Sequence, residues 1–149
     1  SLYGANKAIR GLPFLLHLAT DHLVFVGTSN GIYCSNDGGT SWVPLLHGNI
    51  GPATVIQQIE FSPTFAEDRL FFASVRGKGL YRLTLNNKGW ITSSQNIGIE
   101  LLQKNIQFTE FHLSSNFKQD HTIFGASRER FYISTDGDLT WKISGSPGQ

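Results

Sequence analysis

The sequence predicts an all-β protein made of three four-stranded antiparallel units. A set of features recurs in the same order along the chain, at a period of about 50 residues. Each unit also contains short runs rich in aromatic and β-branched residues, separated by Gly, Asn, Pro or Asp. Four strands at this period are typical of propeller blades. The predicted architecture is therefore three blades of a β-propeller, either part of a longer ring or half of one closed by self-association.

The repeat is clearest in its aromatic and acidic residues. A tyrosine stands nine residues before each of three tryptophans, in the pairs Tyr33 with Trp42, Tyr81 with Trp90, and Tyr132 with Trp141. Further upstream, an aspartate begins an apolar run in each unit, at Asp21, Asp68 and Asp120. We expect one propeller segment over 1–149, with 1–11 ending a preceding blade or forming a linker. The three blades are expected at 12–48, 49–98 and 99–149, with a connecting loop at Ile99–Ile106 and no helix.

Composition narrows the function classes. The net charge of +1 gives no electrostatic footprint for nucleic acid. No apolar run approaches the roughly 20 residues of a membrane span. The single cysteine, Cys34, excludes an internal disulfide and leaves the compartment open. Charged residues make up only 15% of the chain, which suits a protein that buries much of its surface between strands or belongs to a larger assembly.

Two turns closed by tryptophan carry a family resemblance. "CSNDGGTSW" and "ISTDGDLTW" resemble the Asp-box, Ser-x-Asp-x-Gly-x-Thr-Trp, also called the BNR repeat, of sialidase-like and sortilin-like propellers. The matching residues are Ser35, Asp37, Gly39 and Trp42 in the first copy, and Ser134, Asp136, Thr140 and Trp141 in the second. Asp138 replaces the glycine of the second copy, and the middle copy, "LTLNNKGW", keeps only Trp90.

The chemistry of these turns favours a structural role. An aspartate can accept hydrogen bonds from nearby backbone N–H groups, and glycine adopts the positive φ that a tight bend needs. The resemblance implies that the boxes lie at the blade periphery, away from any substrate. The alternative is a calcium site, but the EF-hand spacing and its final glutamate are missing. We therefore expect hairpin locks, with no metal and no cofactor.

A catalytic site is not evident. A sialidase-like site would need clustered arginines and a tyrosine nucleophile with a glutamate partner, whereas the tyrosines here occupy one repeated position. No serine stands in a nucleophile elbow. The leading prediction is a non-catalytic scaffold or binding module. The alternatives are a fragment of a sialidase-like glycoside hydrolase, with its catalytic residues mostly on absent blades, and a lectin-like glycan-binding propeller.

Two sets of residues remain as candidate sites. His17, Glu60 and His112 occupy the same place in the three first strands, where they either bind a divalent metal at the central channel or, as we favour, form hydrogen bonds between blades. The second set consists of basic residues in two expected hairpins. They form either a basic rim that binds an acidic protein partner or a glycan, or simply solvated hairpin tips. The residues are Arg76, Lys78, Arg82, Arg128 and Arg130. The expected assembly partners are a second copy, giving a six-bladed dimer, or the remaining blades of a parent chain.

Overall fold

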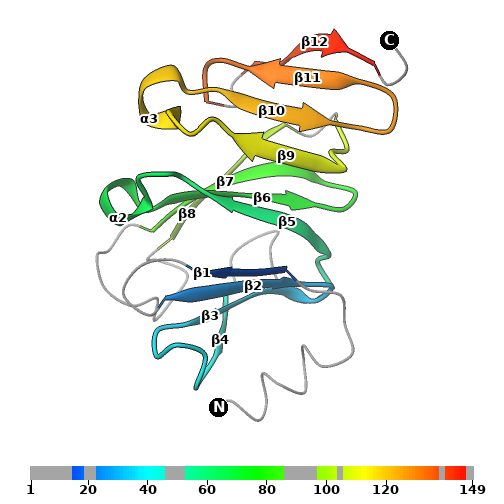
Figure 1. The fold of residues 1–149 in the computed structure, drawn as a ribbon. Coiled ribbons are helices and arrows are strands. Elements are labelled where there is room, and N and C mark those ends of the chain that lie inside the picture. The colour runs from blue at the N-terminus through cyan, green and yellow to red at the C-terminus, as the bar shows by residue number, and fades with distance from the viewer. Residues whose placement is uncertain are drawn as a thin grey trace.

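Three four-stranded antiparallel sheets make up the computed structural model of the chain. The structure describes residues 15–18, 23–45, 53–85, 97–103, 106–137 and 140–146, of which 15–18 and 97–103 are described by their backbone. The all-β prediction and the three antiparallel units are confirmed. The sheets are propeller-like blades stacked one on the next, and the described residues do not close a ring (Figure 1).

The strands follow one another in sequence order within each sheet. The first sheet contains β1 (Leu15–Leu18), β2 (Val24–Thr28), β3 (Gly31–Ser35) and β4 (Val43–Leu45). The second contains β5 (Ile56–Phe61), β6 (Leu70–Val75), β7 (Gly79–Leu85) and β8 (Ile97–Gln103). The third contains β9 (Glu110–Leu113), β10 (Ile123–Ala126), β11 (Phe131–Ser134) and β12 (Lys142–Gly145).

Two one-turn helices correct the expectation of no helix. Helices α2 (Phe65–Asp68) and α3 (Phe117–Asp120) connect the first and second strands of the second and third sheets. Each ends at a residue in the left-handed region, Arg69 at φ 55° and His121 at φ 51°. A helix of a single turn is too short to give a helical period in the sequence. Neither of these described helices is long or apolar enough to span a membrane.

Strand β8 corrects the expected loop at Ile99–Ile106. Residues 97–103 pair antiparallel with β7 and form the outer strand of the second sheet. The run alternates poorly between apolar and polar residues, which concealed its strand character. The boundary that we placed between residues 98 and 99 therefore falls inside a strand. The segment expected to supply the fourth strand, "GWITSS", lies outside the described residues.

Apolar side chains fill the spaces between consecutive sheets. We call the face of a sheet that looks toward the next sheet in the chain its forward face. Phe25 and Ile32 on the forward face of the first sheet pack against the second sheet, in a core that also holds Phe65 and Phe71. Phe72 and Leu80 on the forward face of the second sheet pack against the third, together with Phe117. Burying such a side chain contributes about 1.5–3 kcal/mol.

The second and third sheets are also joined by polar contacts. The side-chain amide of Gln58 donates to the carbonyl oxygen of Phe111 at 2.6 Å, and its oxygen accepts the N–H of Phe111 at 3.0 Å. This pair of bonds links β5 and β9, the first strands of their sheets. Because an amide offers both a donor and an acceptor, Gln58 satisfies both backbone groups of one residue.

Gly125 marks a close approach inside the third sheet. A Cβ atom at this position would lie 2.3 Å from Cε1 of Phe108, which enters the space between the second and third sheets. We expect Gly125→Ala to lower the free energy of unfolding by about 1–3 kcal/mol, because the added methyl group overpacks this space. Chemical denaturation measures the effect.

The matched control is Gly145→Ala in the same sheet, where the added Cβ would meet Phe131 at an ordinary 3.5 Å. Its effect should be small. Equal losses in the two variants would contradict the assigned packing of Phe108.

Candidate functional site

The two tryptophan-closed turns are hydrogen-bonded hairpin locks. In the first, the Asp37 Oδ1 atom accepts the Ser35 hydroxyl at 2.7 Å and the Ser41 N–H at 2.8 Å, and Asp37 Oδ2 accepts the Ser41 hydroxyl. Ser35 Oγ in turn accepts the N–H of Gly39 at 2.8 Å. Gly39 has a φ of 94°, which a side chain would strain. Both carboxylate oxygens of Asp37 thus accept hydrogen bonds from residues of the same turn.

The second turn repeats this pattern. Asp136 Oδ1 accepts the Ser134 hydroxyl and the Thr140 N–H, each at 2.9 Å, and Asp136 Oδ2 accepts the Thr140 hydroxyl. Hydrogen bonds from Ser41 and Ser35 lower the pKa of Asp37 to about 2, and those from Thr140 and Ser134 lower the pKa of Asp136. Both carboxylates stay ionised as hydrogen-bond acceptors. Trp90 and Asp138 lie outside the described residues.

A second repeated lock was missed from the sequence. Ser62 Oγ and Thr64 Oγ1 both donate to Asp68 Oδ2, at 2.7 and 2.8 Å, in the turn that contains α2. Ser114 Oγ donates to Asp120 Oδ2 at 2.7 Å in the turn that contains α3, and this bond lowers the pKa of Asp120. The signal that could have found this lock is the spacing Ser-x-x-Phe-x-x-Asp, which occurs at Ser62–Asp68 and again at Ser114–Asp120.

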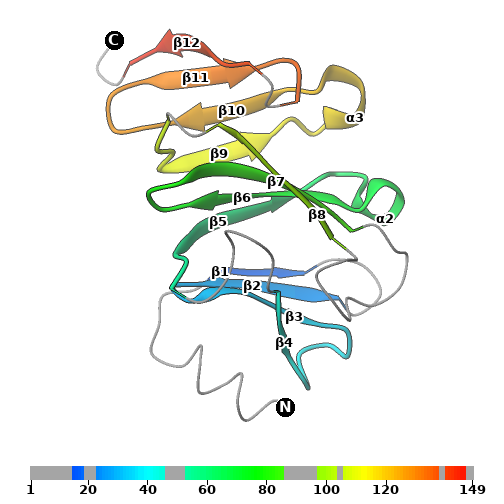
Figure 2. The same cartoon turned by 180° about the vertical axis from the view of Figure 1, so that it is seen from behind.

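Both kinds of lock lie on the same edge of the stack. The N–H of Gly137 in the second box donates to the carbonyl oxygen of His121 at 2.9 Å, which ties the box to the end of α3. Helices α2 and α3 project from this edge in both views (Figures 1 and 2). The hairpins that join the second and third strands turn at the opposite edge. The boxes and the β2–β3, β6–β7 and β10–β11 hairpins therefore lie on opposite edges of the stack (Figures 1 and 2).

Of the predicted set His17, Glu60 and His112, the structure brings Glu60 and His112 together. His112 Nδ1 lies 2.9 Å from Glu60 Oε1 on the preceding sheet, and His112 Nε2 lies 2.6 Å from Glu110 Oε1. The hydrogen bond with Glu110, supported by that with Glu60, raises the pKa of His112. The side chain of His17 is outside the described residues. Within the described part of the chain, no group of three or more His, Cys, Asp or Glu residues is arranged to hold a metal ion.

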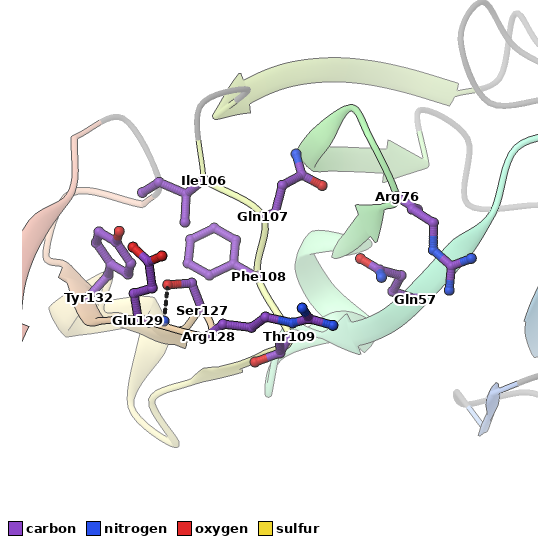
Figure 3. A pocket seen from close by; sticks show the side chains of 10 residues that line it. All are labelled: Gln57, Arg76, Ile106, Gln107, Phe108, Thr109, Ser127, Arg128, Glu129 and Tyr132. Carbon is purple, nitrogen blue, oxygen red and sulfur yellow. Dashed lines mark hydrogen bonds between the residues drawn. The ribbon is translucent and has the colours of Figure 1, made fainter. Parts of the chain in front are cut away.

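The candidate binding site is a pocket of about 600 Å³ between the second and third sheets, on the hairpin edge (Figure 3). Its walls come from the β6–β7 and β10–β11 hairpins, from the start of β5 and from the segment that leads into β9. The lining residues are Gln57, Arg76, Ile106, Gln107, Phe108, Thr109, Ser127, Arg128, Glu129 and Tyr132. One hydrogen bond joins two of these walls: the N–H of Gly77 in the β6–β7 hairpin donates to the side-chain Oε1 of Gln107 at 3.0 Å.

Two arginines of the predicted rim, Arg76 and Arg128, line this pocket. They occupy the same repeat position, four residues after Phe72 and Phe124 respectively, so their hairpins lie on the same edge of consecutive sheets. Among the described residues, neither guanidinium makes a hydrogen bond or an ion pair, and both residues are exposed. Figure 3 shows Arg128 extended toward the side on which Arg76 and Gln57 lie, while Glu129 lies beside Tyr132. The pocket therefore has a cationic end.

The other rim residues do not line the pocket. Lys78 and Arg130 lie on the same two hairpins but are not part of its wall, and Arg82 lies within β7. Sequence reasoning missed the pocket residues that come from the entry to β9, above all Gln107, Phe108 and Thr109. Their role depends on how this segment lies against the β6–β7 hairpin, which no local pattern encodes.

Tyr132 contributes packing to the pocket. Its ring meets Phe108 edge to face, with the centroids 6.0 Å apart. Tyr81, at the same repeat position, is buried in the core between the first and second sheets. Tyr132 itself packs against the core between the second and third sheets, so this repeat position serves packing in both units.

Comparisons with known proteins give a distant structural likeness. No protein-family model matches the chain, and no curated protein matches it in sequence. A solved structure described as "YCF48 bound to D1 peptide" superposes with a TM-score of 0.34 and 14% identity, over 87% of this chain and 52% of that one. The chain thus spans about half the length of that protein. Since the likeness is distant, the fold assignment depends on the three sheets themselves.

Titration of Asp37 tests the hairpin lock. A carboxylate whose folded-state pKa is lowered stabilises the fold above its unfolded pKa, near 3.9, and this contribution disappears as the pH falls through about 2. We expect Asp37→Asn to lower the melting temperature at neutral pH. The difference from the wild type should shrink between about pH 4 and pH 2. Circular dichroism melts across this range measure it, and a difference that stays constant would contradict the lock.

Proposed function

We propose that the chain is a non-catalytic binding module, a segment of an Asp-box propeller, and that the pocket between its second and third sheets binds a carboxylate-rich protein segment. The observation that carries this proposal is the pair Arg76 and Arg128. Two guanidinium groups from neighbouring hairpins line one pocket without a partner among the described residues. Guanidinium groups bind carboxylates in a bidentate geometry, which favours an acidic ligand.

The rest of the pocket suits an extended peptide. Gln57 and Thr109 supply polar groups beside the arginines, and Phe108 supplies an apolar wall. Glu129 lies at the other end, beside Tyr132 (Figure 3), so carboxylates of a ligand are attracted to the arginine end and repelled from the Glu129 end. The pocket is open to the hairpin edge and free of the turn locks, so a ligand can enter without unfolding them.

The turn geometry supports the Asp-box assignment within this proposal. The Ser–Asp–Ser/Thr hydrogen bonds of both turns give the aspartates a structural role, which leaves the opposite edge for recognition. In this account the chain works as a scaffold that places two hairpins at a fixed spacing. Catalysis is not assigned to it.

A hexaglutamate peptide is the probe for the pocket. We expect Arg76→Gln and Arg128→Gln each to weaken its binding by about 1–2 kcal/mol, roughly 5- to 30-fold, because each loses a charge-assisted hydrogen bond. Binding should also weaken as salt is raised, since the groups are exposed. Isothermal titration calorimetry at two salt concentrations measures both effects.

Arg130→Gln is the matched control. It removes the same charge from the same hairpin as Arg128→Gln, yet Arg130 does not line the pocket. Its affinity should stay close to that of the wild type. Equal weakening by both variants would indicate a diffuse charge effect and contradict the pocket, as would the absence of any binding.

A further inference from the structure

His112 lies between two carboxylates at the junction of the second and third sheets. Its Nδ1 lies 2.9 Å from Glu60 Oε1 on β5, and its Nε2 lies 2.6 Å from Glu110 Oε1 on its own strand, β9. A neutral imidazole has a single N–H, so it can donate to only one of these carboxylates while its other nitrogen presents a lone pair. Both contacts are hydrogen bonds at the same time only when the ring is protonated at both nitrogens.

The surroundings of His112 favour the protonated ring. Glu60 faces it from β5 and Glu110 from β9, whereas its cross-strand partner on β10 is the uncharged Phe124. Arg82 lies on β7, two strands away from Glu60 in the second sheet. The hydrogen bond with Glu110, followed by the bond with Glu60 and the charges of both carboxylates, raises the pKa of His112 above its ordinary value of 6.5, against an opposing effect of partial burial.

The Glu60 contact belongs to a continuous set of polar contacts between the two sheets. Glu60 Oε1 lies 3.4 Å from Nε2 of Gln58, and the amide of Gln58 bonds both backbone groups of Phe111. Gln58 and Glu60 are alternate residues of β5, and Phe111 and His112 are adjacent residues of β9. We call these four residues the β5–β9 seam.

The seam adjoins the walls of the pocket. Gln57, which precedes Gln58 on β5, lines the pocket, as does Thr109, which directly precedes Glu110. One wall therefore continues into β5 and another into β9. A change in the spacing of these two strands moves the two walls relative to each other.

Loss of the ring proton should break the contact across the sheets rather than the one within β9. The Glu110 contact is the shorter of the two, and it joins residues two positions apart on one strand, so it needs no particular spacing between the sheets. The single N–H of the neutral ring therefore stays with Glu110. The lone pair of Nδ1 then faces Glu60, and this contact becomes repulsive.

We propose that the β5–β9 seam is a proton-operated latch, in which protonated His112 binds Glu60 and holds the third sheet on the second, and deprotonated His112 releases it. The latch stands on contacts that involve no ligand. Its effect on the pocket, which is to tighten the pocket at lower pH, rests on the proposed function. Because the folded-state pKa of His112 is raised, the latch is complete below about pH 6.5 and is lost as the pH rises through that raised pKa.

Amide hydrogen exchange measures the latch without a ligand. The N–H of Phe111 donates to Gln58 Oε1 across the junction, so its exchange requires the seam to open. We expect its protection factor, corrected for the intrinsic exchange rate at each pH, to fall by about two- to fivefold from pH 6 to pH 9, since a partly exposed ion pair contributes little. The N–H of Gly31, bonded to Thr54 between the first and second sheets, is the internal reference and should change less than this.

Two variants distinguish a latch from a merely structural contact. His112→Gln is uncharged at every pH, so the protection of the Phe111 N–H should already be low at pH 6 and should stay there at pH 9. Glu110→Gln keeps the carboxylate across the junction and removes its competitor, so even the neutral ring can donate to Glu60. This second variant should therefore remain protected at pH 9, where the wild type is not.

Unchanged protection of the Phe111 N–H in the wild type would overturn the latch, as would an equal fall in His112→Gln. Hexaglutamate titrations at pH 6 and pH 9 then test the pocket, where we expect about two- to fivefold tighter binding at pH 6 in the wild type and a smaller change in His112→Gln. If exchange responds to pH but no hexaglutamate binds, the proposed function fails and the latch stands. If exchange responds and binding is the same at both pH values, the effect of the latch on the pocket is contradicted.

Discussion

The packing of one sheet face on the next is the interaction on which the rest of the structure depends. A single four-stranded sheet encloses no core, and within the described residues the second and third sheets each cover the forward face of the sheet before them. The edge-to-face pairs Phe25 with Phe65 and Phe72 with Phe117 lie within these interfaces. Such pairs contribute about 0.5–1.5 kcal/mol beyond their burial. Because the same contact recurs, consecutive sheets are held in the same relative position.

That repetition explains how a pocket arises from ordinary hairpins. Once consecutive sheets stack in the same way, equivalent hairpins lie side by side along one edge, and residues at one repeat position come into the same space. Arg76 and Arg128 line one pocket for this reason. The opposite edge is occupied by the aspartate locks, whose carboxylates accept hydrogen bonds from hydroxyl and N–H donors of the turns. One edge of the stack therefore holds the hydrogen-bonded turns, and the opposite edge holds the hairpins that line the pocket.

Much of the fold could be predicted from the repeat. Tyrosine, tryptophan and aspartate recur at the same spacing, which predicts that each unit has its strands and turns at equivalent places. The hairpin role of Asp37 agrees with its hydrogen bonds. Helices α2 and α3 escaped prediction because one turn has no period, although the paired Phe65 and Phe117 recur at fixed distance from the repeated aspartates. Phe108 and Gln107 could not be assigned, since their contacts cross from one sheet to another. His112 lay in a predicted set, but its bond to Glu60 depends on the stacking distance.

Proton–proton nuclear Overhauser effects between aromatic rings test the stacked-sheet account most directly. The account predicts cross-peaks between the ring protons of Phe72 and Phe117, whose centroids lie 5.7 Å apart, and between those of Phe25 and Phe61, at 5.4 Å. Both pairs join residues of different sheets. Selective phenylalanine labelling, with assignment by single substitutions, resolves them. Absence of both cross-peaks in a folded sample would contradict face-to-face packing of consecutive sheets.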